Sequence, residues 1–130
     1  MPKFILNKLV RDKIPEHQIS TGQNPVYRTL ERDEHTAALA AKVIEEAKEI
    51  PITDISEAIK EIADVQQALD DLREILGITT EDVHNAQTVK NEKAGAFKEG
   101  RFVESVSPGE DNKWTDYYRT DPGRFIEVAE

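Results

Sequence analysis

The run DEHTAALAAKVIEEAKEI at residues 33–50 decides the fold class of this chain. It is rich in residues that favour helices. Its apolar side chains recur at spacings of four, four and three residues, which places them on one helical face: Leu39, Val43, Ala47 and Ile50. Pro51 ends this predicted helix, because proline cannot donate a helical hydrogen bond and disfavours helical geometry at the residue before it.

A second, longer helix is predicted directly after this turn. Asp54 and, three residues later, Glu57 form an N-terminal capping signature. Apolar residues then alternate at spacings of four and three: Ala58, Ile62, Val65, Leu69, Leu72 and Leu76. Gly77 supplies the left-handed position that stops a helix, and Thr79 or Thr80 can cap a third one that frays at Gly95.

The two ends of the chain lack this periodicity. Residues 1–32 contain scattered prolines and a glycine, and they predict an irregular arm. Residues 101–130 predict a polar tail that includes a short strand at 101–106. We therefore expect an all-α fold in one domain over residues 1–130, in which residues 33–100 form an antiparallel helical bundle.

Composition limits the classes of partner. With 17 Lys and Arg against 26 Asp and Glu, the net charge of −9 disfavours binding to a nucleic acid polymer through its phosphates. The absence of cysteine excludes disulfides, thiolate zinc sites and cysteine nucleophiles. No stretch approaches the roughly 18 apolar residues of a membrane span, and no secretory signal is visible. We expect a soluble, cytoplasmic protein without a membrane partner.

Carboxylates gather on both predicted helices. Glu45, Glu46 and Glu49 fall within about one turn of the first helix, while Glu61 and Asp64 share a face of the second. The turn at Pro51 makes the two helices antiparallel neighbours, so both groups lie near the same end of the hairpin.

This carboxylate arrangement has two interpretations. Like charges at neighbouring helical positions cost about 0.2–0.5 kcal/mol per pair unless a cation neutralises them. Carboxylates without histidine or thiol select a hard ion, magnesium first and manganese as a substitute, and magnesium sites often include substrate phosphates. The alternative is an ordinary solvated face of an acidic protein.

Two basic segments are candidates for holding a polyphosphate. Each also has a plain interpretation, since lysines near a helix end complement the helix dipole and charged arms are often simply solvated. The candidates are Lys90, Lys93 and Arg101 in one segment, and Lys8, Arg11 and Lys13 in the other. The three histidines are not assigned to the site: His84 has half of a di-iron motif, and His17 and His35 are predicted to be surface residues.

Four motifs in order resemble a known family. EExxE at residues 45–49 followed by ExxD at 61–64 resembles the MazG-like, all-α nucleoside triphosphate pyrophosphohydrolase superfamily. KLVRDKIPE at 8–16, and KNEKAGAF at 90–97 followed by Arg101, are similar to its phosphoribosyl-ATP pyrophosphohydrolase-like branch, which is regarded as a group of house-cleaning enzymes. Together these segments extend over residues 3–104.

The resemblance implies a function. It implies that magnesium is held by Glu46, Glu49, Glu61 and Asp64, and that Glu45 supports a ligand or orients water. It also implies hydrolysis between the α and β phosphates of a nucleoside triphosphate, non-canonical ones included, to a nucleoside monophosphate and pyrophosphate. Lys90, Lys93 and Arg101 would hold the polyphosphate, and the helical bundle would assemble as a homodimer or homotetramer.

The chain also departs from the branch. AGAF at residues 94–97 stands where the branch usually has an Arg-Gly-Gly-Phe-like segment, so one basic group is missing. The spacing between the two acidic motifs is short, and residues 105–130 lie outside the match. Three alternatives remain: phosphoribosyl-ATP hydrolysis, against which the KLVRDKIPE arm argues; a non-catalytic helical module; and a nucleotide sensor.

Overall fold

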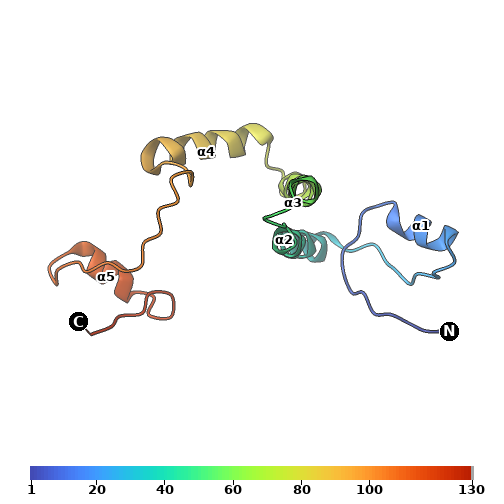
Figure 1. Ribbon diagram of the computed structural model, residues 1–130, viewed down its shortest axis with the longest axis horizontal. Helices are drawn as coiled ribbons and strands as arrows, with labels where there is room; N and C mark the ends of the chain where they lie inside the picture. Colours follow the sequence, from blue (N-terminus) through green and yellow to red (C-terminus); the bar gives the residue numbers. More distant parts are fainter. Residues whose placement is uncertain (130) are drawn as a thin grey trace. The chain divides into compact units, whose positions relative to one another are not determined.

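The computed structural model describes residues 1–129, and these residues contain five α-helices and no strand (Figure 1). The helices are α1 (Ile14–Ser20), α2 (Arg32–Lys48), α3 (Ile55–Ile75), α4 (Thr80–Ala94) and α5 (Lys113–Arg119). The fold class is all-α, as the sequence predicts.

The described chain forms two compact units. The first is Met1–Glu92, which holds α1, α2, α3 and most of α4, and the second begins at Lys93. This division does not test whether residues 1–130 form a single domain or whether the helices form a bundle. Both stay predictions.

An antiparallel hairpin of α2 and α3 is the packed part of the first unit. At one end, Arg32 at the start of α2 donates a hydrogen bond of 3.1 Å to the carbonyl of Ile75 at the end of α3. Leu39 and Ala68 are the buried apolar residues of the hairpin, at 4% and 6% exposure. So small a core means that the hairpin buries one narrow seam between its two helices.

Local capping fixes the length of α3. The Asp54 side chain accepts a hydrogen bond of 3.1 Å from the Glu57 backbone N–H, as the capping signature predicts. At the other end, Gly77 adopts a φ of 71°, the left-handed conformation that glycine takes without a steric cost. Thr79 and Asp82 then exchange two hydrogen bonds of 3.0 Å and begin α4.

A second apolar face of α3 is uncovered within the first unit. Its side chains are between 43% and 72% exposed, and we call them the α3 stripe: Ile55, Ile59, Ile62, Leu69 and Leu76. They fall on alternating spacings of four and three, with Gln66 and Arg73 at the remaining positions. This spacing is the heptad pattern of a helix that packs along a second helix.

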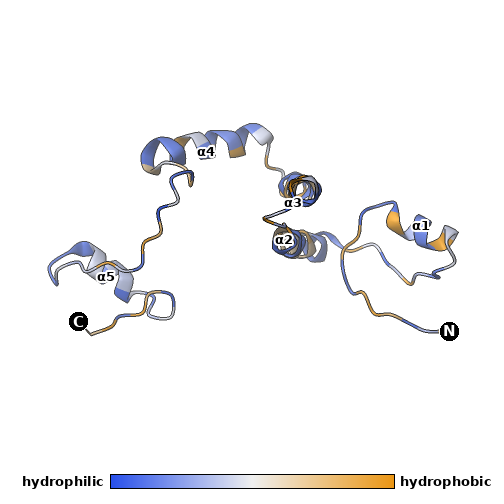
Figure 2. Ribbon diagram, in the orientation of Figure 1, coloured by the Kyte–Doolittle hydropathy of each residue, from blue (hydrophilic) through white to orange (hydrophobic). Residues whose placement is uncertain are grey.

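The other helices contribute little burial. Every residue of α4 is exposed, and polar residues dominate its length (Figure 2). None of the described helices combines the length and the apolar character that crossing a membrane requires.

The second unit corrects two expectations about the tail. The strand predicted at residues 101–106 is wrong, because these residues have irregular backbone and no strand in residues 1–129 offers hydrogen-bond partners. The helix α5 lies within the segment predicted as a polar tail. Its first turn is capped by the Asn112 side chain, which accepts a hydrogen bond of 2.9 Å from the Trp114 N–H. Trp114, Tyr117, Tyr118 and Phe125 pack edge-on or tilted against one another.

Arg119 forms two ion pairs in the second unit that predict a dependence of its stability on pH. Arg119 donates to Glu110 at 3.0 Å and to Glu127 at 2.8 Å, and its hydrogen bonds lower the pKa of both carboxyl groups. A lowered folded-state pKa stabilises the fold above the ordinary carboxyl value, and this stability is lost as the pH falls through the folded-state value. We expect acid to open the unit, which the fluorescence of Trp114, the single tryptophan, would report. Arg119→Gln should flatten this pH dependence, and Lys98→Gln should leave it unchanged.

Candidate functional site

Three carboxylates from the two hairpin helices converge at one end of the hairpin. Glu46 on α2 and Glu61 and Asp64 on α3 each offer an oxygen, and these oxygens lie within 4.8 Å of one another. Glu46 is buried at 8% exposure, and Glu61 and Asp64 are half-buried. The antiparallel register produces this convergence, because it sets the end of α2 beside the beginning of α3. We call these residues the carboxylate cluster.

Glu61 is the strained member of the carboxylate cluster. Its Oε2 atom is buried and has no hydrogen-bond partner among residues 1–129. Burial raises the pKa of Glu61, and the nearby charges of Glu49, Asp64 and Glu46 raise it further. A buried carboxylate oxygen without a donor is unfavourable, so a cation at this point would relieve both the lost hydration and the repulsion. An all-oxygen donor set fits a hard divalent ion such as magnesium or manganese.

Lys42 partly neutralises the cluster from within α2. Its ammonium lies 3.0 Å from the Glu46 carboxylate, one helical turn away, and 3.4 Å from that of Glu45. Burial lowers the pKa of Lys42, but the hydrogen bond to Glu46 and the charges of both glutamates outweigh it and raise the pKa. Lys42 is therefore a positive charge that α2 holds beside Glu46 in the lining of the pocket.

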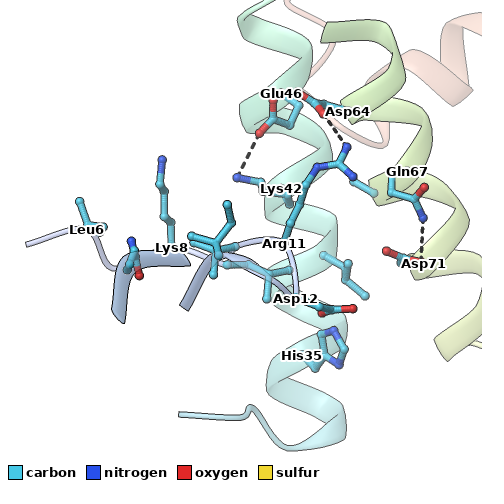
Figure 3. Close-up of a pocket in the computed structure, with 16 residues that line it drawn as sticks. Leu6, Lys8, Arg11, Asp12, His35, Lys42, Glu46, Asp64, Gln67 and Asp71 are labelled. Atoms are coloured by element: carbon cyan, nitrogen blue, oxygen red, sulfur yellow. Dashed lines mark hydrogen bonds and ion pairs between the residues drawn. The ribbon is translucent and has the colours of Figure 1, made fainter. Parts of the chain in front are cut away.

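Arg11 reaches the cluster from the N-terminal arm. Its Nη2 atom donates a hydrogen bond of 2.6 Å to Oδ1 of Asp64, across 53 residues of sequence. Figure 3 shows the Arg11 side chain crossing from the arm toward α3, while Lys42 extends from α2 toward Glu46. Within residues 1–129, this is the one hydrogen bond that joins the arm before α2 to α3.

A pocket of about 560 Å³ lies between the arm and the hairpin, next to the cluster. The cations Lys8, Arg11 and Lys42 line it together with Glu46 and Asp64. Figure 3 shows that Asp12, His35 and Asp71 lie toward the opposite end from the two carboxylates. The pocket thus has Glu46 and Asp64 at one end with cations beside them, and Asp12, His35 and Asp71 toward the other end.

Two predicted acidic residues lie around this cluster. Glu49, a predicted ligand, caps the C-terminus of α2, is exposed, and is outside the group of three close carboxylates, although its charge raises the pKa of Glu61. Glu45, the predicted supporting residue, is half-buried and paired with Lys42. All three members of the cluster are therefore among the residues predicted from the sequence, and Glu45 and Glu49 are their neighbours along α2.

The predicted basic residues divide into two groups. Lys8 and Arg11 line the pocket, whereas Lys13 is the exposed N-cap residue of α1 and does not line it. Lys90 is exposed on α4 and is not a lining residue. Lys93 and Arg101 belong to the second unit, where Arg101 pairs with Glu99 at 2.6 Å.

Two lining residues were missed or misjudged from the sequence. Lys42 was not a candidate, although its position four residues before Glu46 is the spacing of a helical ion pair and could have indicated it. His35 was predicted to be a surface residue, but it is half-buried and lines the pocket. That prediction failed because the pocket wall is completed by the arm, whose course no periodicity reveals.

Comparisons with known proteins give one curated relative. The chain is 48% identical over 54 residues to an uncharacterised protein of Mycolicibacterium smegmatis. The match covers 42% of this chain and 55% of the relative, so the chain spans about half the length of the curated relative that it matches. No family model matches the chain, and no solved structure matches it. The case for a function therefore rests on the site.

Proposed function

We propose that this chain is a magnesium-dependent nucleotide pyrophosphohydrolase that cleaves a nucleoside triphosphate between its α and β phosphates. The observation that carries the proposal is the juxtaposition of the carboxylate cluster with a pocket lined by Lys8, Arg11 and Lys42. Carboxylates alone would favour the binding of a metal ion, and cationic side chains alone would favour the binding of an anion. Their presence in one pocket favours a ligand that contains both a metal ion and an anionic group, such as a metal-bound polyphosphate.

The size of the pocket agrees with such a ligand. Small-molecule sites commonly enclose about 300–1,000 Å³, and this pocket holds about 560 Å³. Its polar end, with His35 and Asp71, offers hydrogen-bonding groups to a sugar or a base. The phosphate chain would lie toward the carboxylate cluster, where the cations are.

The residues that surround the pocket would have different roles in phosphoryl transfer, according to where they lie. Glu46, Glu61 and Asp64 would hold the ion, and Glu49, whose charge raises the pKa of Glu61, is a candidate for a fourth ligand. Bound magnesium would supply a nucleophile at neutral pH and neutralise charge on the phosphates. Lys42 pairs with the Glu46 carboxylate and orients it, while Lys8 and Arg11 would orient the polyphosphate from the arm.

Release of pyrophosphate is the direct test. Canonical, oxidised and deaminated nucleoside triphosphates would be supplied with magnesium, with phosphoribosyl-ATP in the same panel and Glu49→Gln and Asp64→Asn as controls. Pyrophosphate release that both variants lose would support the proposal and rank the substrates. Turnover confined to phosphoribosyl-ATP would assign the related activity. Binding without turnover would indicate a nucleotide sensor, and neither binding nor turnover a non-catalytic helical module.

We also propose that the enzyme is a cytoplasmic homodimer paired through the α3 stripe. The stripe has the heptad spacing of a coiled-coil seam, and its apolar side chains find no cover within the first unit. A second copy presents the same stripe, so pairing of the two α3 helices about a twofold axis would bury the stripes of both copies against each other. A tetramer would need a further surface of the same kind.

A further inference from the structure

We propose that Arg11 is an exchangeable counter-ion, which neutralises Asp64 when the site holds no metal and transfers to substrate phosphate when metal is bound. This inference rests on the metal site of the proposed function. It adds that the arm couples the binding of metal and phosphate, so that neither is bound tightly without the other.

The two cations of the site differ in how they are tethered. Lys42 and Glu46 lie four residues apart on one helix, so α2 itself holds them together. Arg11 meets Asp64 across 53 residues, from a segment with irregular backbone. Its side chain is 60% exposed and that of Asp64 is 35% exposed. Arg11 can therefore leave Asp64 without breaking a helix or opening the core.

Asp64 cannot serve both partners equally well. Its Oδ1 atom accepts a hydrogen bond of 2.6 Å from the Arg11 guanidinium, and its carboxylate is also one of the three that form the carboxylate cluster. A guanidinium at that distance repels a divalent ion held by the same carboxylate. Arg11 therefore competes with metal for Asp64, and occupancy by metal weakens the Arg11 contact.

The released guanidinium has a second partner at hand. Arg11 lines the same pocket as Lys8 and Lys42, and a planar guanidinium binds phosphate oxygens with two parallel hydrogen bonds. Phosphate bound in the pocket would thus hold Arg11 away from Asp64 and favour metal binding. By linkage, metal favours phosphate binding by the same factor, and such couplings are typically about 5- to 150-fold.

The experiment measures binding in the full chain rather than turnover. Manganese alone would be titrated calorimetrically into the wild type, Arg11→Gln and Lys13→Gln, the last being an exposed cation of the same arm that does not line the pocket. We expect Arg11→Gln to bind manganese at least about five-fold more tightly than the wild type, because the competitor is gone. Lys13→Gln should match the wild type.

A second titration follows the phosphate side. Preformed magnesium pyrophosphate would be added to each protein in excess magnesium. Arg11→Gln should bind it more weakly than the wild type, so that one substitution changes the two affinities in opposite directions. Hydrogen exchange in residues 6–13 should also rise when manganese saturates the wild type, since the arm loses its hydrogen bond to α3.

The outcomes separate this inference from the proposed function. Manganese affinity that is unchanged or weakened in Arg11→Gln would overturn the exchange, even if the wild type hydrolyses nucleotides. Affinity changes of opposite sign in a protein without turnover would support the exchange and reject the enzyme. Absence of manganese binding in both proteins would overturn the exchange.

Discussion

Glu61→Gln is expected to reduce magnesium-dependent pyrophosphate release by about a thousand-fold, since metal assistance is worth several kcal/mol and each 1.4 kcal/mol is about ten-fold in rate. The buried Oε2 atom of Glu61 has no hydrogen-bond donor in the described structure, so it is the oxygen best placed to receive a cation. Steady-state kinetics over a range of magnesium concentrations would measure the effect. Glu74→Gln, the same substitution on an exposed part of α3, is the matched control and should retain full activity.

The same variant should behave in the opposite way in a stability measurement. Without metal, Glu61→Gln should raise the melting temperature, because it removes a charge that Glu46, Glu49 and Asp64 repel. Added magnesium should raise the melting temperature of the wild type and leave that of the variant nearly unchanged. A variant that keeps wild-type kinetics, or that melts earlier without metal, would contradict the role given to Glu61.

A double substitution in the α3 stripe, Ile59→Glu with Leu69→Glu, is expected to convert a dimer to a monomer. Each buried aliphatic side chain contributes about 1.5–3 kcal/mol, and a symmetric dimer would lose four of them. The dissociation constant should therefore rise by about ten-thousand-fold or more. Light scattering after size-exclusion chromatography would measure the mass of both proteins.

The control for this substitution is Ile52→Glu, in the loop between α2 and α3, where the side chain is 93% exposed and lies outside the stripe. It should leave the mass unchanged. If the wild type is itself a monomer, the proposed self-pairing is wrong. A monomeric wild type that loses stability in the double variant would indicate that another part of the same chain covers the stripe.

The helices were predictable because their signals are local. Asp54 caps α3 within one turn, and Gly77 ends it at the residue where the left-handed conformation is needed. The cluster followed from the same information, since a short turn at Pro51 dictates which helix ends meet. What the sequence reveals in this chain is therefore the hairpin and the three carboxylates that the hairpin brings together.

The remaining features depend on contacts without a local signal. Arg11 and Asp64 are 53 residues apart, and nothing in the irregular arm indicates where its cations will lie. The strand at residues 101–106 was inferred from residue type alone, although a strand needs a partner that the described chain does not provide. The short helix α5 has too few turns for periodicity to show, and its Asn112 cap was the signal available.

The hairpin has a further consequence for how such a protein can change. Glu46, Glu61 and Asp64 all lie within residues 46–64, so one short stretch of sequence contains the carboxylate cluster, and its geometry depends on the single turn between α2 and α3. Lys8, Arg11 and Asp12, in contrast, belong to a separate segment laid over it. Substitutions confined to that segment would therefore change the lining of the pocket while the three carboxylates of the hairpin keep their arrangement.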